Sequence, residues 1–240
     1  MHSNNYQKTI KKSVIAKGIG LHTGLNSIIK FKPAKPDSGI NFIRTDVDKC
    51  PLILASIDNV IDIARGTIIS KDGFKIHTVE HILSAIAGLG IDNILIELSS
   101  KEPPVLDGSS KPFVDLLQKA GIESQGTLKK EFIVDKTISY IDKNNGIEIH
   151  LLPSDSFKVT FISDYNADSI GTQHFTFNYS EEKYINEISS ARTFCLFSEI
   201  MPLKEAGLIK GGSIENAVVF VDKKIKKNEV KKICDAFKIN

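Results

Sequence analysis

An apolar segment that opens with a carboxylate and an imidazole, residues 77–89, constrains the fold more than any other stretch of this chain. Its large apolar residues recur at positions i, i+3, i+4 and i+7, which predicts an α-helix with one face in a hydrophobic core. These residues are Val79, Ile82, Leu83 and Ile86. The other faces carry small residues and no charge after His81, so we expect burial on most sides. Thr78 is the predicted N-cap, which places Glu80 in the first turn, where the helix dipole favours a carboxylate.

The adjacent pair Glu80 and His81 allows three interpretations. In the first, His81 is a hydrogen-bonded core residue of a capped helix. In the second, the pattern H-x-x-E-H binds a metal through His77 and His81, as in inverted zinc proteases. That geometry needs His77 inside the helix, whereas a cap at Thr78 leaves it at the end of a strand over 73–76. In the third, His81 binds a metal, Glu80 is the general base, and the other ligands are distant in sequence. This stretch alone leaves all three open.

Composition describes an ordinary globular protein. The chain has 240 residues, 41% of them hydrophobic and 25% charged, with a net charge of +2, and this balance gives no indication of nucleic-acid binding. Its three cysteines show no C-x-x-C spacing, which is typical of a reducing compartment. The N-terminus lacks the apolar core of a signal peptide, and no apolar run is long enough to span a membrane. We therefore expect a cytoplasmic protein without a membrane anchor.

The first half of the chain is predicted to contain several short strands and two helices. An almost continuous apolar run at 94–98 is suited to a buried central strand. The glycine-rich stretch 17–24 is interpreted as a turn, because no lysine follows its last glycine and no helix follows it. Asp107 lies in a loop and either binds backbone amides or has a functional role. Further strands are expected at 9–16, 26–31, 40–42, 52–54 and 67–69, and the second helix from Pro112 to Ala120, ended by Gly121.

A polar stretch containing Gly126 is expected to separate two domains. The N-terminal domain is predicted at 1–125, the linker at 126–130 and the second domain at 131–240. In the second domain, apolar and polar residues alternate from Ile147 to Leu152, which predicts a half-buried strand. Other strands are expected at 131–134, 137–141, 158–163 and 217–221 and around Phe175 and Phe177. Short helices are expected at 181–188 and 198–206, and a terminal amphipathic helix carrying Val230, Ile233 and Phe237.

Six short segments, in this order and spacing, carry a family resemblance. They are residues 18–24, 78–81, 88–93, 107–109, 191–194 and 211–213. With them the chain resembles the zinc-dependent UDP-3-O-acyl-N-acetylglucosamine deacetylases of lipid A (lipopolysaccharide) biosynthesis. The resemblance implies an α+β fold of two similarly folded domains, each layering helices on a β-sheet, with the active site between them. It also favours the third interpretation of Glu80 and His81.

The resemblance implies a substrate, a cofactor and residue roles. The substrate would be UDP-3-O-acyl-N-acetylglucosamine, which loses its N-acetyl group, and the cofactor Zn²⁺. His81 would be a zinc ligand, Glu80 the general base, and Thr193 the donor to the oxyanion. Tyr165 would stack on the uracil side of the substrate. The other substrate-binding residues, including those of the passage for the acyl chain, would be Phe194, Leu208, Gly212, Ser213 and Ala217.

The chain also departs from the family pattern. Members of the family carry a helix with the motif H-K-x-x-D-x-x-G-D, whose His and Asp complete the zinc site, and this motif is absent from residues 1–240. We therefore expect a C-terminally truncated member, with its remaining zinc ligands beyond Asn240, an incomplete second domain and exposed apolar surface. A fused or downstream C-terminal segment would supply the missing part. The alternative is a catalytically inactive remnant that binds a nucleotide-sugar or a partner.

Overall fold

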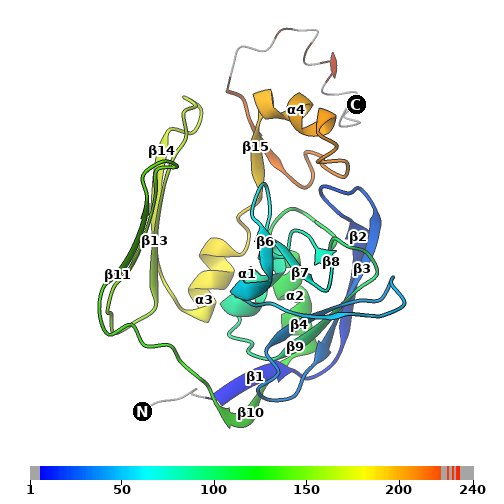
Figure 1. The fold of residues 1–240 in the computed structure, drawn as a ribbon, viewed down its shortest axis with the longest axis vertical. Coiled ribbons are helices and arrows are strands. Elements are labelled where there is room, and N and C mark those ends of the chain that lie inside the picture. The colour runs from blue at the N-terminus through cyan, green and yellow to red at the C-terminus, as the bar shows by residue number, and fades with distance from the viewer. Residues whose placement is uncertain (1–5, 223–225, 227–228, 230, 233–240) are drawn as a thin grey trace.

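The computed structural model describes residues 6–222, 226, 229 and 231–232 and has a mixed α+β architecture (Figure 1). This confirms the α+β class predicted from the sequence. No helix in the described part of the chain is long and apolar enough to cross a membrane. The terminal helix predicted around Val230, Ile233 and Phe237 lies outside the described residues.

A five-stranded sheet with the order β2-β3-β9-β4-β5 forms the centre of the fold. The predicted central strand is β9, which pairs antiparallel with β3 and parallel with β4. Its residues Ile94, Ile96 and Leu98 are fully buried, as the continuous apolar run predicted. The strands are β2 (Val14–Ile19), β3 (Asn26–Pro33), β4 (Ile40–Arg44), β5 (Leu52–Leu54) and β9 (Ile94–Leu98).

Two helices, α1 (Glu80–Gly88) and α2 (Lys111–Ala120), share one hydrophobic core with this sheet (Figure 1). The ring of Phe113 on α2 meets Phe31 on β3 edge to face, with 6.2 Å between the ring centroids. The apolar stripe predicted for α1 packs into the same core: three of its residues are fully buried and the fourth, Leu83, is partly buried. Gly121 ends α2 with a φ of 74°, a left-handed value that glycine adopts without strain.

One strand prediction at the edge of the first half is wrong. The segment 9–16, predicted as one strand, belongs to β1 (Tyr6–Ile10) and β2, which residues 11–13 separate. Part of the predicted linker 126–130 is strand, because β10 (Ile122–Leu128) pairs antiparallel with β1. The polar sequence of β10 did not indicate a strand, because its pairing partner β1 lies more than 100 residues away. The Gln125 side-chain amide also holds this strand in place by donating to the Ala34 carbonyl at 2.8 Å.

A small three-stranded sheet leads into α1. Its strands are β6 (Val60–Asp62), β7 (Ile68–Lys71) and β8 (Phe74–Ile76). The predicted N-cap at Thr78 is wrong: Val79 occupies the cap position without a side-chain bond, and the Thr78 hydroxyl donates instead to Glu102 Oε1 at 3.0 Å. His77 follows β8, outside the helix, and its backbone N–H donates to the Lys101 carbonyl at 2.9 Å. An inverted zinc protease requires two histidines at positions i and i+4 on one helix face. Helix α1 does not provide them, because His77 lies outside it.

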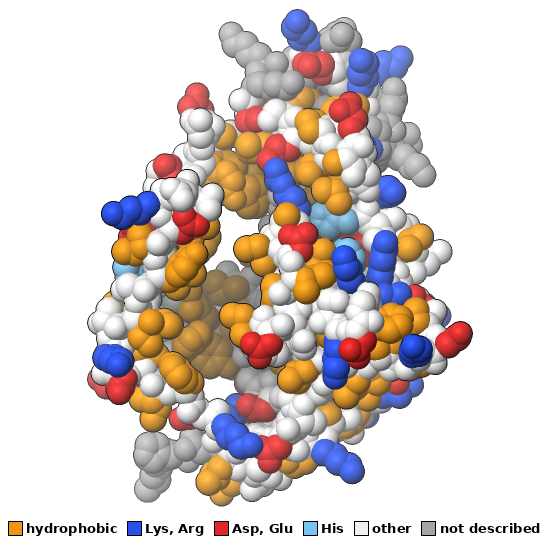
Figure 2. Space-filling view, viewed as in Figure 1, with side chains coloured by type: hydrophobic (Ala, Val, Ile, Leu, Met, Phe, Trp, Pro, Cys, Tyr) orange, Lys and Arg blue, Asp and Glu red, His pale blue; other side chains and the backbone are white. Residues whose placement is uncertain are grey.

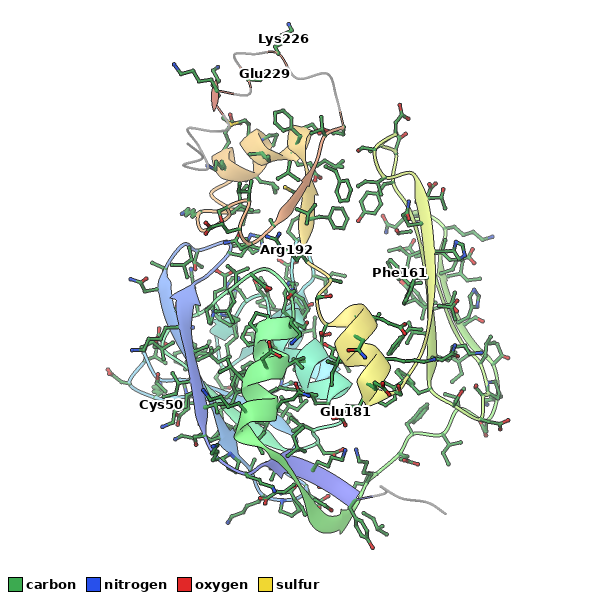
Figure 3. All side chains as sticks on the ribbon, turned by 180° about the vertical axis from the view of Figure 1, so that it is seen from behind. Cys50, Phe161, Glu181, Arg192, Lys226 and Glu229 are labelled. Atoms are coloured by element: carbon green, nitrogen blue, oxygen red, sulfur yellow. The ribbon has the colours of Figure 1, made fainter. Side chains whose placement is uncertain are left out.

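Two long hairpins in the second half expose much apolar surface. One pairs β11 (Ile138–Asp142) with β12 (Ile147–Leu151), and the other pairs β13 (Lys158–Asp164) with β14 (Thr172–Asn178). The strand predicted at 147–152 forms as β12, but neither of its faces is buried, and Ile147, Ile149 and Leu151 remain 46%, 56% and 45% exposed. Residues 131–134, also predicted as a strand, have no regular secondary structure. Figure 2 shows hydrophobic side chains around a hollow between these hairpins and the rest of the molecule. A groove of about 330 Å³ runs there between α1 and aromatic side chains such as Phe161, which is 66% exposed (Figure 3).

The chain then returns to the first half through a short helical segment and ends in a small α/β unit. The predicted helix at 181–188 is α3 (Glu181–Lys183), continued by a π-helical turn, Tyr184–Ile188. The predicted helix at 198–206 is a 3₁₀ turn, Phe197–Glu199, followed by α4 (Ile200–Glu205). The 3₁₀ turn and α4 pack on the parallel strands β15 (Phe194–Leu196) and β16 (Val218–Phe220). Phe197, Ile200 and Ile209 form the small core of this unit.

Close packing of Tyr184 against Gly88 joins the two halves. The Tyr184 side chain is 5% exposed, and its hydroxyl lies 2.7 Å from Ser84 Oγ on α1. A Cβ atom at Gly88 would overlap the Tyr184 ring. The glycine near the end of α1 is therefore required by a neighbour about 100 residues away rather than by the helix itself.

We expect Gly88→Ala to destabilise the protein by about 1–3 kcal/mol, because overpacking outweighs the helix propensity that alanine gains. Urea unfolding measures the change. In a Tyr184→Ala background the same substitution should be neutral or stabilising, by up to about 1 kcal/mol. Equal destabilisation in both backgrounds would contradict this explanation.

Candidate active site

Glu80 lies in the first turn of α1, as predicted, and a loop between β6 and β7 holds its carboxylate. The backbone N–H of Thr67 donates to Glu80 Oε2 at 2.9 Å, and the Thr67 carbonyl accepts from the Val79 N–H at 3.4 Å. Gly66 lies so close that a Cβ atom there would be 3.4 Å from Glu80 Oε1. One Glu80 oxygen is thereby bound to the backbone of the loop.

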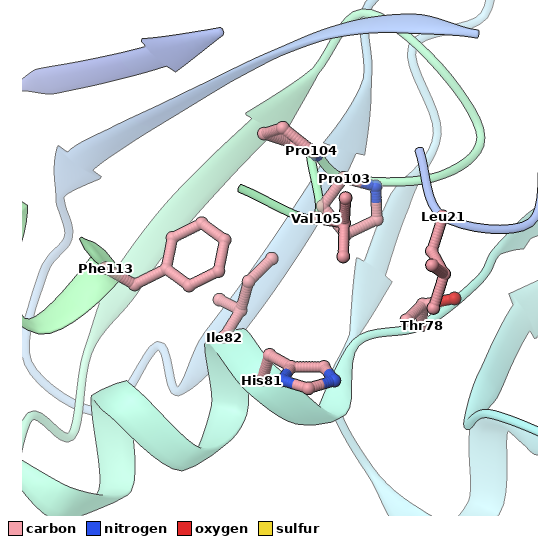
Figure 4. A pocket seen from close by; sticks show the side chains of 8 residues that line it. All are labelled: Leu21, Thr78, His81, Ile82, Pro103, Pro104, Val105 and Phe113. Carbon is pink, nitrogen blue, oxygen red and sulfur yellow. The ribbon is translucent and has the colours of Figure 1, made fainter. Parts of the chain in front are cut away.

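His81 lies beside Glu80 at the edge of an apolar cavity of about 10 Å³ (Figure 4). The residues around it are Leu21, Thr78, Ile82, Pro103, Pro104, Val105 and Phe113. Burial lowers the pKa of His81 below its ordinary value, although the charges of Glu80 and Asp107 oppose this shift. The imidazole is therefore neutral at pH 7, which is the form that binds a metal ion.

The second half brings further predicted residues to the same place. A polar cleft of about 370 Å³ contains Glu80 and His81 together with Tyr165, Thr193 and Phe194. Residues that the sequence analysis did not select complete the lining: Arg65, Ala191, Arg192 and Glu199. Hence five of the predicted site residues, two from the first half of the chain and three from the second, line one cleft.

Backbone hydrogen bonds fix Thr193 in this cleft. Its N–H donates to the Gly108 carbonyl at 2.8 Å, and its own carbonyl accepts from the Val218 N–H at 2.9 Å. The neighbouring Arg192 donates through Nε to the Asp107 carbonyl at 2.8 Å, and Figure 3 shows it where the two halves meet. The Asp107 carboxylate accepts from the N–H and hydroxyl of Ser109, so this side chain shapes the loop to which Thr193 and Arg192 are bound.

An apolar cavity of about 70 Å³ adjoins the polar cleft and shares Arg65, Thr193 and Phe194 with it. Gly212 and Ala217 line this cavity. Its other residues are Leu21, His22, Cys195, Leu203, Ile209 and Val219. The remaining two predicted residues do not line either space: Leu208 packs on the core of the small α/β unit, and Ser213 donates its N–H to Asn216 Oδ1 at 2.8 Å.

Aromatic and ionic contacts form the other wall of the cleft. The rings of Tyr165 and Phe194 meet edge to face with centroids 5.4 Å apart, which places Tyr165 beside the predicted substrate residues. Arg65 Nη2 lies 2.6 Å from Glu199 Oε1, and this contact lowers the pKa of Glu199. The ion pair connects the loop beside Glu80 with the small α/β unit.

Sequence reasoning also gave no role to Glu102 and His22, which lie behind the cleft. Glu102 is fully buried, and its carboxylate accepts hydrogen bonds from the N–H groups of His22 and Thr23 and from the hydroxyls of Thr23 and Thr78. His22 Nε2 lies 3.0 Å from the Arg65 carbonyl, so this nitrogen carries the proton, and buried Nδ1 has no partner among the described residues. No local pattern reveals these contacts, because they join residues between 24 and 80 positions apart.

No group of three or more His, Cys, Asp or Glu side chains within the described residues could hold a metal ion. His81 has Glu80 and Asp107 near it, but these do not form a ligand set. The residues present therefore do not fit a complete metal site.

Fold and cleft together define a mixed α+β protein that places a carboxylate and an imidazole, adjacent in sequence, in a cleft next to an apolar cavity. A model of the LpxC family, described as UDP-3-O-acyl N-acetylglycosamine deacetylase, matches residues 7–237. The chain therefore belongs to this family.

Three relatives illustrate the similarity. A bifunctional enzyme LpxC/FabZ of Chlorobaculum tepidum is 44% identical over 230 residues, which are 96% of this chain and 49% of that protein. A bifunctional enzyme LpxC/FabZ of Bacteroides thetaiotaomicron is 38% identical over 95% of this chain and 50% of its own length. A UDP-3-O-acyl-N-acetylglucosamine deacetylase of Saccharophagus degradans is 42% identical over 219 residues, which are 90% of this chain and 71% of that protein. The chain thus spans about half the length of the two bifunctional relatives.

The hydrogen bonds at Glu102 predict how stability depends on pH. Burial alone would raise the pKa of Glu102, but the donors from His22, Thr23 and Thr78 outweigh it and lower the pKa below its ordinary value. The unfolded chain then takes up the proton first as the pH falls. The stability that this carboxylate contributes is present at pH 7 and is lost below about pH 4.3.

We expect Glu102→Gln to be less stable than the parent by about 1–3 kcal/mol at pH 7 and to lose less stability in acid. Urea unfolding between pH 7 and pH 3.5 measures both effects. Glu123→Gln, at an exposed position of β10, is the control and should follow the parent curve. Parallel curves for parent and Glu102→Gln would contradict the prediction.

Proposed function

We propose that this site serves a zinc-dependent hydrolase that removes the N-acetyl group from UDP-3-O-acyl-N-acetylglucosamine, the committed step of lipid A biosynthesis. The observation that carries the proposal is the polar cleft with Glu80, His81 and Thr193, which shares three residues with an apolar cavity. A substrate with a polar sugar nucleotide and an acyl chain matches such a pair of spaces. Relatives named UDP-3-O-acyl-N-acetylglucosamine deacetylase support the same assignment.

In this proposal Glu80 is the general base. Hydrolysis forms a bond from the water oxygen to the acetyl carbonyl carbon and breaks the bond from that carbon to the glucosamine nitrogen. Glu80 accepts the proton that the water loses, and the departing amine takes up one proton. The Thr67 N–H, 2.9 Å from Oε2, keeps the carboxylate in one orientation. General bases of this kind contribute about 10²–10⁴-fold to the rate.

The cleft residues have matching roles in substrate binding. Thr193, fixed at its N–H and carbonyl, would donate its hydroxyl to the oxyanion, a contact worth about 3–4 kcal/mol in other enzymes. Tyr165 and Phe194 would bind the uracil side. Gly212 and Ala217 line the apolar cavity proposed for the acyl chain, and Leu208 and Ser213 would support the segment that carries them.

His81 would be one ligand of a zinc ion, and such an ion would supply Lewis-acid activation of the amide and of water. The described residues do not complete the ligand set, and we propose that polypeptide beyond Asn240 supplies the rest. The same polypeptide would complete the second of two similarly folded domains, and the enzyme would act in the cytoplasm. Bifunctional relatives named LpxC/FabZ support the idea of further sequence after the matched region.

Metal analysis tests the ligand assignment. We expect the purified 240-residue chain to bind less than one zinc per molecule at micromolar concentration, because one imidazole gives too little of the binding free energy. A fusion to the C-terminal remainder of the deacetylase region of the Chlorobaculum tepidum relative should bind one zinc, and His81→Ala should abolish it. Stoichiometric zinc on the 240-residue chain alone would contradict the assignment.

Acetate release by the same fusion tests the reaction. The fusion should hydrolyse UDP-3-O-acyl-N-acetylglucosamine, and Glu80→Gln should lower kcat by about 10²–10⁴-fold without loss of UDP binding. Glu123→Gln serves as the control. If the fusion binds UDP-sugar and zinc but releases no acetate, the alternative of an inactive remnant replaces this proposal. If Glu80→Gln is as active as the fusion, the base is a different residue.

A further inference from the structure

Two structural paths, each made of hydrogen bonds and short backbone segments, lead from the buried carboxylate of Glu102 to Glu80. Neither path is visible in the local sequence around Glu80. Both begin at a side chain that is 0% exposed and that lies outside the lining of the polar cleft. Glu102 therefore does not face the space proposed for substrate.

The first path runs through Thr78. Its φ of 54° is in the left-handed region, which is strained for a β-branched residue. The Thr78 hydroxyl is held by Glu102 Oε1 at 3.0 Å. Because Thr78 is the turn between β8 and the start of α1, its conformation sets the direction in which the helix begins. Glu80 and His81 follow immediately in the first turn.

The second path runs through the turn that follows β2. The N–H groups of His22 and Thr23 donate to Glu102 at 2.9 and 2.8 Å, which fixes the backbone of this turn. The His22 ring then donates to the Arg65 carbonyl at 3.0 Å. Two residues further on, the Thr67 N–H donates to Glu80 Oε2. The loop that holds the Glu80 carboxylate is thus itself held by His22.

The donor set explains why a carboxylate is present. The four donors that reach Glu102 from the described residues are all neutral, two backbone N–H groups and two hydroxyls, and each oxygen accepts two of them. An ionised carboxylate accepts at both oxygens, whereas an amide would place an N–H₂ group against two of these donors. A buried charge that forms no salt bridge with a described residue is costly, so its presence favours a role that needs this geometry.

We propose that Glu102 is the positioning residue of this site, holding the 20–24 turn and Thr78 together so that Glu80 keeps its orientation against the Thr67 N–H. The inference rests on the proposed function only in so far as Glu80 is the base. Its structural consequence, the ordering of the 65–67 loop on Glu80, holds without substrate or metal.

Amide hydrogen exchange tests the structural consequence on the 240-residue chain. In Glu102→Gln the Thr67 amide should exchange about tenfold faster than in the parent, while buried β9 amides such as that of Ile96 change less. The ¹⁵N shifts of the His22 ring should also lose the signature of a protonated Nε2. A purely structural role would accelerate both amides by the same factor, and that result would overturn the proposal, as would unchanged exchange at Thr67.

A double-mutant cycle connects Glu102 with Glu80. Glu80→Ala removes the acceptor of the Thr67 N–H and sets the upper limit of its exchange rate. If Glu102 acts through Glu80, adding Glu102→Gln to Glu80→Ala should accelerate Thr67 little further. Full additivity of the two substitutions would overturn the proposal. Thr78→Val, which removes one donor, should reproduce part of the effect, whereas Thr78→Ser keeps the hydroxyl and should restore it. If Glu102→Gln does not fold, the comparison of Thr78→Val with Thr78→Ser tests the positioning role of Glu102.

Activity provides a separate readout. In an active fusion, Glu102→Gln should lower kcat by about tenfold or more with little change in KM, since the substrate does not touch Glu102, and Glu123→Gln should change neither. If the fusion is inactive, the proposed function fails while the exchange results still decide the role of Glu102. If the fusion is active and kcat does not fall, the positioning role is wrong even though the function stands.

Discussion

Burial of α1 against the sheet centred on β9 is the constraint on which the rest of the structure depends. The helix has little charge beyond its first turn, and its apolar stripe lies in the main core with Ile94, Ile96 and Phe113. The charged and ionisable groups of this helix all lie at its N-terminal end. Glu80 and His81 occupy that end, where the dipole favours the carboxylate and partial burial keeps the imidazole neutral.

The cleft forms because two loops of the first half meet the second half at very close range. A Cβ atom at Gly108 would overlap the Asn216 backbone, and one at Gly211 would overlap the Gly20 carbonyl. Close approach of backbone to backbone brings Thr193 beside the 107–109 loop and the apolar cavity beside His22. Glycine is needed at both contacts because a side chain at either position would overlap the opposing backbone.

Stability is distributed unevenly between the halves. The main core draws most of its residues from the first half, with only a few contributions from the second, such as Phe177 and Tyr184. The hairpins β11–β12 and β13–β14 carry exposed apolar residues on their faces, which globular proteins usually cover. On one side, the site is formed by α1 and the hydrogen bonds of Glu102. On the other side it is formed by the small α/β unit, which the Arg65–Glu199 ion pair connects to the first half.

The sequence by itself determined the elements whose signal is local. The period of the apolar residues predicted α1, the continuous apolar run predicted β9 at 94–98, and Gly121 predicted the end of α2. The resemblance selected Glu80, His81 and Thr193 as site residues, and in the structure all three line one cleft. Only the tertiary structure decided what depends on distant partners. Strand β10 exists because β1 pairs with it, Thr78 gives up its capping role because Glu102 takes its hydroxyl, and Glu102 itself has a role only through donors up to 80 residues away. Hydrogen bonds between segments so far apart leave no periodicity in the chain, which is why the support of the site could not be read from its sequence.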